Sequence, residues 1–191
     1  FPEPEIRQFS ADQGWPLDRL RHAEIDVAIT CDLQIPEGVT FFALAELPAH
    51  AVVSEAHPLA HKPSVTLAEL AQEPLILLDL PLSLEYFFAL FFNEGLQPRI
   101  HSRSSHQDVV RTMVANGYGY TLANVRPRSD CALDGRRIVR VPISGNHRPM
   151  VIGTATLANI KKSRLVEAFE QHCRESISSQ YIPGMDALFS K

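Results

Sequence analysis

The chain has 191 residues, of which 45% are hydrophobic and 21% are charged. This length is enough for one compact domain or for two small lobes, and the balance is that of an ordinary globular protein rather than a disordered, collagen-like or coiled-coil chain. The formal net charge is −4, whereas a domain that neutralises many nucleic-acid phosphates should be basic. The composition therefore argues against nucleic-acid binding by these residues themselves.

Three cysteines lie far apart in the chain, at Cys31, Cys131 and Cys173. A disulfide framework or a cysteine-based zinc site needs paired or closer spacing, so we expect reduced thiols in a cytoplasmic protein. No run of about 18 apolar residues predicts a membrane span, and the start of the chain has no signal-peptide pattern. Because the chain begins with Phe1 rather than Met, we expect it to be a fragment.

Short β-like runs alternate with helical patterns in the first half of the chain, which favours an α/β fold. Strands are expected at 6–9, 24–30, 41–44, 51–53 and 75–78, and helices at 16–22 and directly after the capping box Thr66–Glu69. In the strand 24–30, Ile25, Val27 and Ile29 should form one apolar face. Pro48 separates two strands and indicates an edge or a change of layer. Residues 55–63 are predicted to form a loop.

The second half continues the same alternation. Helices are expected at 84–94, from a second capping box at Ser104–Gln107 to Asn116, and at 160–178; strands are expected at 99–103, 120–123, 138–141 and 150–155. Ser83 and Asn159 are predicted N-caps, and Gly95 is a predicted helix stop. The last helix should bury a stripe of Leu165, Val166, Phe169, Cys173 and Ile177. The tail from Gln180 is expected to be loosely held.

Four segments in order carry a family resemblance: 23–29, 57–60, 65–78 and 113–120. Together they resemble the effector-binding domain of LysR-type transcriptional regulators over about residues 1 to 180. The resemblance implies an α/β fold of two Rossmann-like lobes joined by two crossover strands, like the type 2 periplasmic binding proteins. Lobe I would comprise 1–50 and 154–191, and lobe II 51–153. The family's DNA-binding module, and the first strand and helix of lobe I, are expected to precede Phe1.

A ligand cleft between such lobes needs a few fixed donors in an apolar wall. Helix N-termini supply such donors for carboxylates and phosphates, and they are expected at Ser83 and Ser104, after strands whose carboxyl ends are the usual ligand edge. The candidate ligand-binding residues are Thr30, Cys31, Ser83, Tyr86, Ser104, His106 and Asn124. Each has a plain alternative: a helix cap for both serines, a loop anchor for Thr30, a buried apolar group for Cys31, a surface imidazole for His106 and a turn residue for Asn124. Tyr86 belongs to an aromatic-rich helix with Phe87, Phe88 and Phe91 as its core stripe.

No catalytic motif is present. The sequence has no G-x-S-x-G elbow and neither glycine-rich phosphate motif. His57 and His61 have a helical metal-ligand spacing, but Pro58 and Pro63 disfavour the helix that would use it. We therefore predict no catalytic residue, no metal site, no cofactor and no enzymatic activity.

The leading hypothesis is a LysR-type effector-sensing domain that binds a small molecule, favoured to be an organic acid, between the lobes and so controls transcription. Its partners would be the effector, further copies of the chain in a dimer or tetramer, and DNA through a winged helix-turn-helix outside this chain, with no membrane involved. The alternative is the solute-binding protein of a transporter with the same fold. An enzyme on this fold is a third hypothesis, but the sequence offers it no identifiable nucleophile or acid–base pair.

Overall fold

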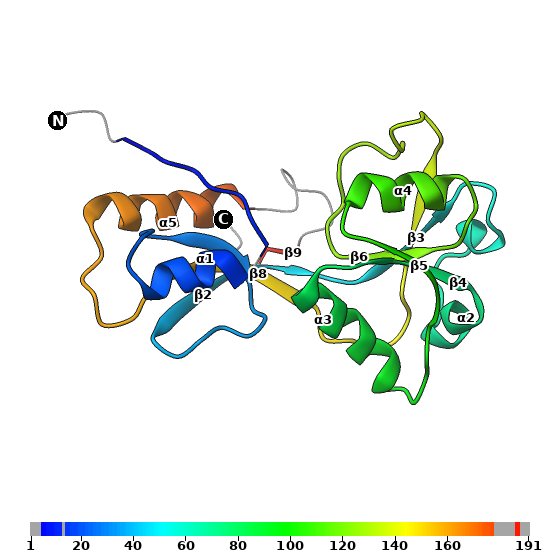
Figure 1. Cartoon of the computed structure of the whole chain (residues 1–191), viewed down its shortest axis with the longest axis horizontal. Coiled ribbons are helices and arrows are strands. Elements are labelled where there is room, and N and C mark those ends of the chain that lie inside the picture. Colours follow the sequence, from blue (N-terminus) through cyan, green and yellow to red (C-terminus); the bar gives the residue numbers. More distant parts are fainter. Residues whose placement is uncertain (1–4, 13, 178–185, 188–191) are drawn as a thin grey trace.

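The computed structural model describes residues 5–12, 14–177 and 186–187. Figure 1 shows two groups of elements side by side, which we call the first and second lobes. They are joined by the segment between β2 and β3 and by the segment that leads into β8.

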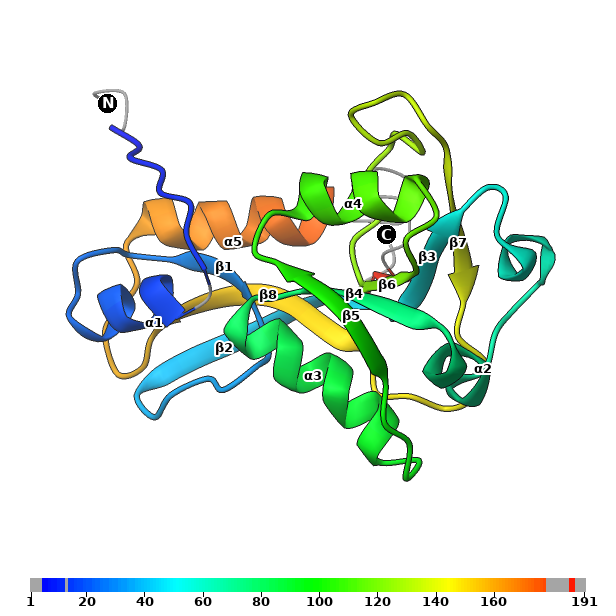
Figure 2. The same cartoon turned by 45° about the vertical axis from the view of Figure 1, so that its right-hand side comes forward.

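The first lobe is built on an antiparallel sheet with strand order β1-β8-β2-β9, comprising β1 (Ala28–Cys31), β8 (Met150–Leu157), β2 (Val39–Leu47) and β9 (Asp186–Ala187). Figure 2 shows helices α1 (Gly14–Arg21) and α5 (Arg164–Ser176) on opposite faces of this sheet. Ala155 of β8 packs on α1, whereas its neighbour Thr154 contacts Glu170 of α5, as expected from the alternation of side chains along a strand.

The second lobe contains the parallel pair β4 (Pro74–Leu78) and β5 (Arg99–Ser104) and the antiparallel group β6 (Thr121–Ala123), β3 (His50–Ser54) and β7 (Ile138–Pro142). Hydrogen bonds between Tyr120 and the β4 backbone bring the two groups together. Around them lie α2 (Leu67–Gln72), α3 (Pro81–Phe92), α4 (Gln107–Ala115) and the 3₁₀ helix η1 (Pro58–His61). η1 lies within residues 55–63, which were predicted to be only a loop.

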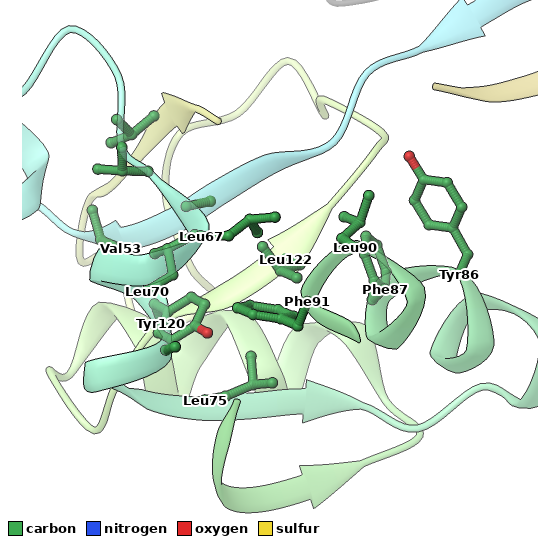
Figure 3. Close-up of a cluster of buried hydrophobic side chains, with 14 of the residues drawn as sticks. Val53, Leu67, Leu70, Leu75, Tyr86, Phe87, Leu90, Phe91, Tyr120 and Leu122 are labelled. Carbon is green, nitrogen blue, oxygen red and sulfur yellow. The ribbon is translucent and has the colours of Figure 1, made fainter. Parts of the chain in front are cut away.

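The core of the second lobe is a large apolar cluster (Figure 3). Phe91 and Tyr120 are fully buried at its centre, with Leu75 and Leu122 against them. Tyr86 lies at the edge of the cluster, where its hydroxyl points away from Phe87 and Leu90. The aromatic stripe predicted for this helix is confirmed for Phe87 and Phe91, while Phe88 is half-buried.

Pro48 marks the point where the chain changes sheet, as predicted. β2 ends at Leu47 in the sheet of the first lobe, and β3 begins at His50 in the second. The chain returns between β7 and β8. β8 pairs with the first-lobe strands from its first residue, since Met150 lies opposite Leu47. The residue boundaries given above for the two lobes stay a prediction.

Two strand predictions near the N-terminus are wrong. Residues 6–9 form no strand: Ile6 and Phe9 are exposed, and the Phe9 ring packs on Trp15. The predicted strand 24–30 is formed only from Ala28, and its buried face is the opposite one, because Ile29 is 51% exposed while its neighbour Ala28 packs under α1. Alternation identifies two faces of a strand but does not say which of them the fold covers.

Three predicted helix starts are also wrong. Helix α3 begins at Pro81, since proline suits the first turn, so Ser83 is its third residue and not its N-cap. The capping box at Ser104 is absent: His106 is the N-cap of α4, and the Ser104 hydroxyl accepts a hydrogen bond from the His106 N–H at 3.2 Å. Helix α5 begins at Arg164 with Ser163 as its cap, because Asn159 has a left-handed backbone with φ of 62°.

The remaining helix predictions have mixed outcomes. The capping box of Thr66 and Glu69 is confirmed. In the α5 stripe Val166 and Cys173 are buried, whereas Leu165 and Phe169 are exposed. The predicted tail from Gln180 lies outside the described residues except for Asp186 and Ala187, which pair with β2.

Candidate functional site

A cavity of about 410 Å³ lies where the two lobes meet. The first lobe contributes α1 with the segment before it and the turn after β1, and the second lobe contributes the start of α3. The volume is within the range of small-molecule pockets in proteins. The polar side chains that line it belong to Asp12, Asp18, Arg21, Gln34 and Ser83.

The start of α3 supplies hydrogen-bond donors to the cavity. Leu80, the N-cap, makes no side-chain hydrogen bond to the helix, and Pro81 has no N–H. The N–H groups of Leu82 and Ser83 come next and have no carbonyl acceptor within the helix because of their position. Both residues line the cavity. The positive end of the helix dipole therefore faces a space in which two amide donors are available to a ligand.

Charged side chains of α1 and the segment before it line the opposite wall. Arg21, at the end of the helix, brings a cation, and Asp12 and Asp18 bring carboxylates. All three side chains belong to exposed residues. This wall can bind hydroxyl or amino groups through the carboxylates, and a carboxylate through Arg21. It is therefore suited to a ligand that carries both kinds of group.

A hydrogen-bonded network joins the lobes beside the cavity. The Tyr86 hydroxyl of α3 donates to the carbonyl of Arg148 at 2.9 Å. The Asn124 amide donates to the carbonyl of Leu47 at 2.7 Å and contacts the Tyr86 hydroxyl at 3.5 Å. Burial raises the pKa of the Tyr86 hydroxyl, so it stays a neutral donor. These bonds tie α3 and the loop after β6 to the strands that cross between the lobes.

Three further contacts support the same junction. Asp32, just after β1, accepts a hydrogen bond from the Val151 N–H at 2.9 Å and forms an ion pair with Arg148. Gln34 donates to the Glu85 carboxylate of α3 at 2.6 Å. The turn after β1 is thus connected to the start of β8 and, across the lobes, to the helix that borders the cavity.

Of the seven candidate ligand residues, Ser83 alone lines this cavity. Tyr86 and Asn124 lie together next to it, both buried and both engaged in the network between the lobes. Thr30 is buried within β1, opposite Gly153. Cys31 is half-buried, and burial raises the pKa of its thiol to about 11.

The remaining two candidates, Ser104 and His106, lie at the end of β5 and do not line the cavity. They are nonetheless close to the α3 segment, because the Asp79 N–H donates to the Ser104 carbonyl at 2.9 Å. A ligand role for any of the seven residues stays a prediction.

The sequence reasoning missed four polar lining residues: Asp12, Asp18, Arg21 and Gln34. Helix periodicity places the first three at or near α1 but gives no hint that α3 lies opposite. Gln34 has a left-handed backbone with φ of 48°, and the nearby Pro36 was the available sign of a turn at this place.

The fold and this junction define the class of the protein: a two-lobed α/β binding domain with a cavity between its lobes. The sequence model described as the LysR substrate binding domain matches residues 1–178. The chain therefore belongs to the family of LysR substrate-binding domains, which are type 2 periplasmic-binding-protein-like α/β folds. This confirms both the resemblance and the fold class inferred from the sequence.

Individual relatives agree with this assignment. The chain is 27% identical over 160 residues to the uncharacterized HTH-type transcriptional regulator YybE of Bacillus subtilis, which is 83% of this chain and 53% of that protein. It is 28% identical over 123 residues to the transcriptional regulator OxyR of Escherichia coli, which is 64% of this chain and 40% of OxyR. The chain thus spans about half the length of the curated relatives it matches.

Solved structures give the same result. A putative LysR family regulator from Pseudomonas aeruginosa superposes with a TM-score of 0.88 at 30% identity, covering 93% of this chain and 63% of that one. The effector-binding domain of QuiR in complex with shikimate superposes with a TM-score of 0.74 at 22% identity, covering 87% of this chain and 78% of that one, and is similar in fold.

Among the described residues, no helix is long and apolar enough to cross a membrane.

Proposed function

We propose that this domain senses a small organic acid in the cavity between its lobes and thereby controls transcription. The observation that carries the proposal is the start of α3, where two amide donors without helix acceptors line a cavity of ligand size. The relatives supply the context, because they are transcriptional regulators rather than enzymes or transport proteins.

The lining of the cavity narrows the class of acid. A carboxylate would bind at the α3 amides and Arg21, and hydroxyl or amino groups would donate to Asp12 and Asp18. A hydroxylated or amino-substituted acid can bond to both walls, whereas a plain hydrophobic acid would bond only to the α3 amides and Arg21. The proposal therefore favours polar acids such as shikimate, which is the compound bound to QuiR.

Sensing requires that the effector bind one arrangement of the lobes more tightly than another. A ligand that contacts α1 and α3 at once satisfies this condition, because the distance between those helices depends on how the lobes sit. We also propose that the full protein binds DNA through an N-terminal winged helix-turn-helix and that its effector domains associate at least in pairs. The boundaries that we propose between the lobes lie at residues 50/51 and 153/154.

A thermal-shift panel tests the proposal, because a ligand of the native state raises the unfolding midpoint. The panel compares shikimate and other hydroxy acids with their neutral amides and with amines of similar size. We expect the acids to raise the midpoint and the amides to have little effect. If only amines or apolar compounds raised the midpoint, the ligand would not be an organic acid and the proposal would be contradicted.

Two variants locate the site. Because Ser83 lines the cavity, Ser83→Ala should weaken binding of the panel acid about tenfold if its hydroxyl bonds the carboxylate. Ser105→Ala is the matched control, since this exposed serine lies outside the cavity at the other predicted helix end. Equal affinities for the two variants would show that the Ser83 hydroxyl does not bond to the acid and would leave the backbone amides as the only donors at this end of α3.

A further inference from the structure

A second, smaller pocket lies in the first lobe, away from the cavity between the lobes. It has a volume of about 110 Å³ and is bordered by the turn before β1, the end of β8 and the start of α5. The polar side chains that line it belong to Asp26, Thr156, Lys161, Lys162 and Ser163. The effector site proposed above uses none of these residues.

The Thr156 hydroxyl is the unusual group in this pocket. Thr156 is 3% exposed, and its Oγ1 has no hydrogen-bond partner among the residues that the structure describes. Thr154 and Thr156 are two residues apart and so project from the same face of β8. The Thr154 hydroxyl contacts Glu170 of α5, so Thr156 faces the same helix one step closer to its N-terminus. A buried hydroxyl without a partner is destabilising unless something occupies the space before it.

The other groups around the pocket favour an anion. Helix α5 has 13 residues, and Ser163 is its N-cap. The Ser163 hydroxyl accepts a hydrogen bond at 3.2 Å from the N–H of Val166, the third residue of the helix. The first two residues of α5, Arg164 and Leu165, do not line the pocket, so the positive end of the helix dipole acts on it only from nearby. Lys162 is neutralised by Glu170, with N···O distances of 2.6 and 2.7 Å. Exposed Lys161 forms no ion pair within the described ranges, so its ammonium group is available to an anion in the pocket.

Asp26 sets a condition on which anion fits. Its carboxylate also lines the pocket, and it would repel an oxyanion that carries no proton. An oxyanion with a hydroxyl group can instead donate a hydrogen bond to Asp26 while its other oxygens accept bonds from Thr156 and Lys161. At neutral pH phosphate carries such a proton, whereas sulfate does not.

We propose that this pocket is a second ligand site of the domain, specific for a protonated oxyanion of the phosphate type, with the Thr156 hydroxyl and Lys161 as donors and Asp26 as acceptor. Its position on α5 and β8 is separate from α3, so it can be occupied together with the cavity between the lobes.

Calorimetric titration with inorganic phosphate and with sulfate, at constant ionic strength, tests the site. We expect saturable binding of phosphate and at least about tenfold weaker binding of sulfate. Asp26→Asn should reduce this preference, because an amide can donate to sulfate. Titration with glycerol phosphate distinguishes free phosphate from the phosphoryl group of a larger ligand, and binding of either supports the site. If neither inorganic phosphate nor glycerol phosphate binds saturably, the pocket holds only water and the proposal is overturned.

Variants establish where the anion binds. Thr156→Val keeps the size of the side chain and removes the hydroxyl, and it should weaken phosphate binding about tenfold. Lys161→Gln should weaken it about threefold and reduce its salt dependence. Arg136→Gln removes the same charge at an exposed position of the second lobe and should leave the affinity unchanged.

Amide shifts on phosphate titration should centre on residues 156–166. Because shifts and unfolding midpoints are measured on the same samples, a Thr156→Val variant that fails to fold is recognised, and Lys161→Gln then carries the test. Phosphate binding that is lost in Ser83→Ala and kept in Thr156→Val would place the anion between the lobes and refute the inference.

Discussion

Replacement of Asn124 by leucine removes the buried hydrogen bond that joins the loop after β6 to the end of β2. Asn124 is 6% exposed, and its amide lies 2.7 Å from the Leu47 carbonyl oxygen. Leucine has a similar size but no donor, so that carbonyl loses a partner away from water. A buried hydrogen bond contributes about 1 kcal/mol, and an acceptor left without a partner raises the loss to about 1–3 kcal/mol. We expect a fall of about 2 kcal/mol in the free energy of unfolding.

Urea denaturation of the wild type and of two variants measures this loss. Asn93→Leu is the matched control, because Asn93 is exposed at the end of α3 and its replacement should change stability by less than about 0.5 kcal/mol. The dependence of the unfolding free energy on urea concentration should be the same in the variants as in the wild type, which would show that unfolding exposes the same amount of surface. The reasoning is refuted if Asn124→Leu and Asn93→Leu have equal midpoints, since the bond between the lobes would then contribute nothing measurable.

Three further predictions concern pH, backbone geometry and the junction. Burial lowers the pKa of His50 from 6.5 to about 4, so the unfolded chain binds a proton before the folded one as pH falls. The contribution of His50 to stability should therefore drop by about 3 kcal/mol between pH 6.5 and 4 and change no further below pH 4. His50→Gln should remove this part of the pH dependence in denaturation curves. Gly119→Ala would place a Cβ 2.1 Å from the Pro74 carbonyl oxygen, so we expect the free energy of unfolding to fall by at least about 3 kcal/mol. Gly117→Ala is the control and should lower it by about 1 kcal/mol, because φ is positive there but the space is open. Similar losses for the two variants in denaturation curves would contradict the clash with Pro74. Tyr86→Phe should lower stability by about 1 kcal/mol in the same assay through loss of its bond to a backbone carbonyl, and an unchanged midpoint would argue against that bond.

The sequence predicted the alternation of strands and helices well, because it is encoded locally. The apolar run of β4, the capping box of Thr66 and the break at Pro48 each depend on a few neighbouring residues. Which face of β1 is buried was not predictable in this way, since α1 determines it from a distance. The helix starts failed for a related reason: several residues near each start suit a cap or a first turn, and the fold uses Pro81 as the first residue of α3 and Ser163 as the cap of α5.

The candidate site was predictable only in part. The sequence predicts Ser83 as a helix cap, whereas in the structure Ser83 is the third residue of its helix and lines the cavity. Tyr86 and Asn124 are separate ligand-binding candidates in the sequence, and the fold brings them together at the junction between the lobes. Arg21 and Gln34 could not be chosen, because they become neighbours of α3 only when the two lobes meet. Pairs that belong to different lobes leave no periodic signal in the sequence.

The most direct test of the account is an amide chemical-shift map during titration with the panel acid that gives the largest thermal shift. We expect the amide signals of Leu82 and Ser83 to shift most, together with those of Arg21 and Gln34 on the facing lobe. Shifts confined to one lobe, or centred on β5 and the start of α4, would show that the acid does not bind between the helices α1 and α3.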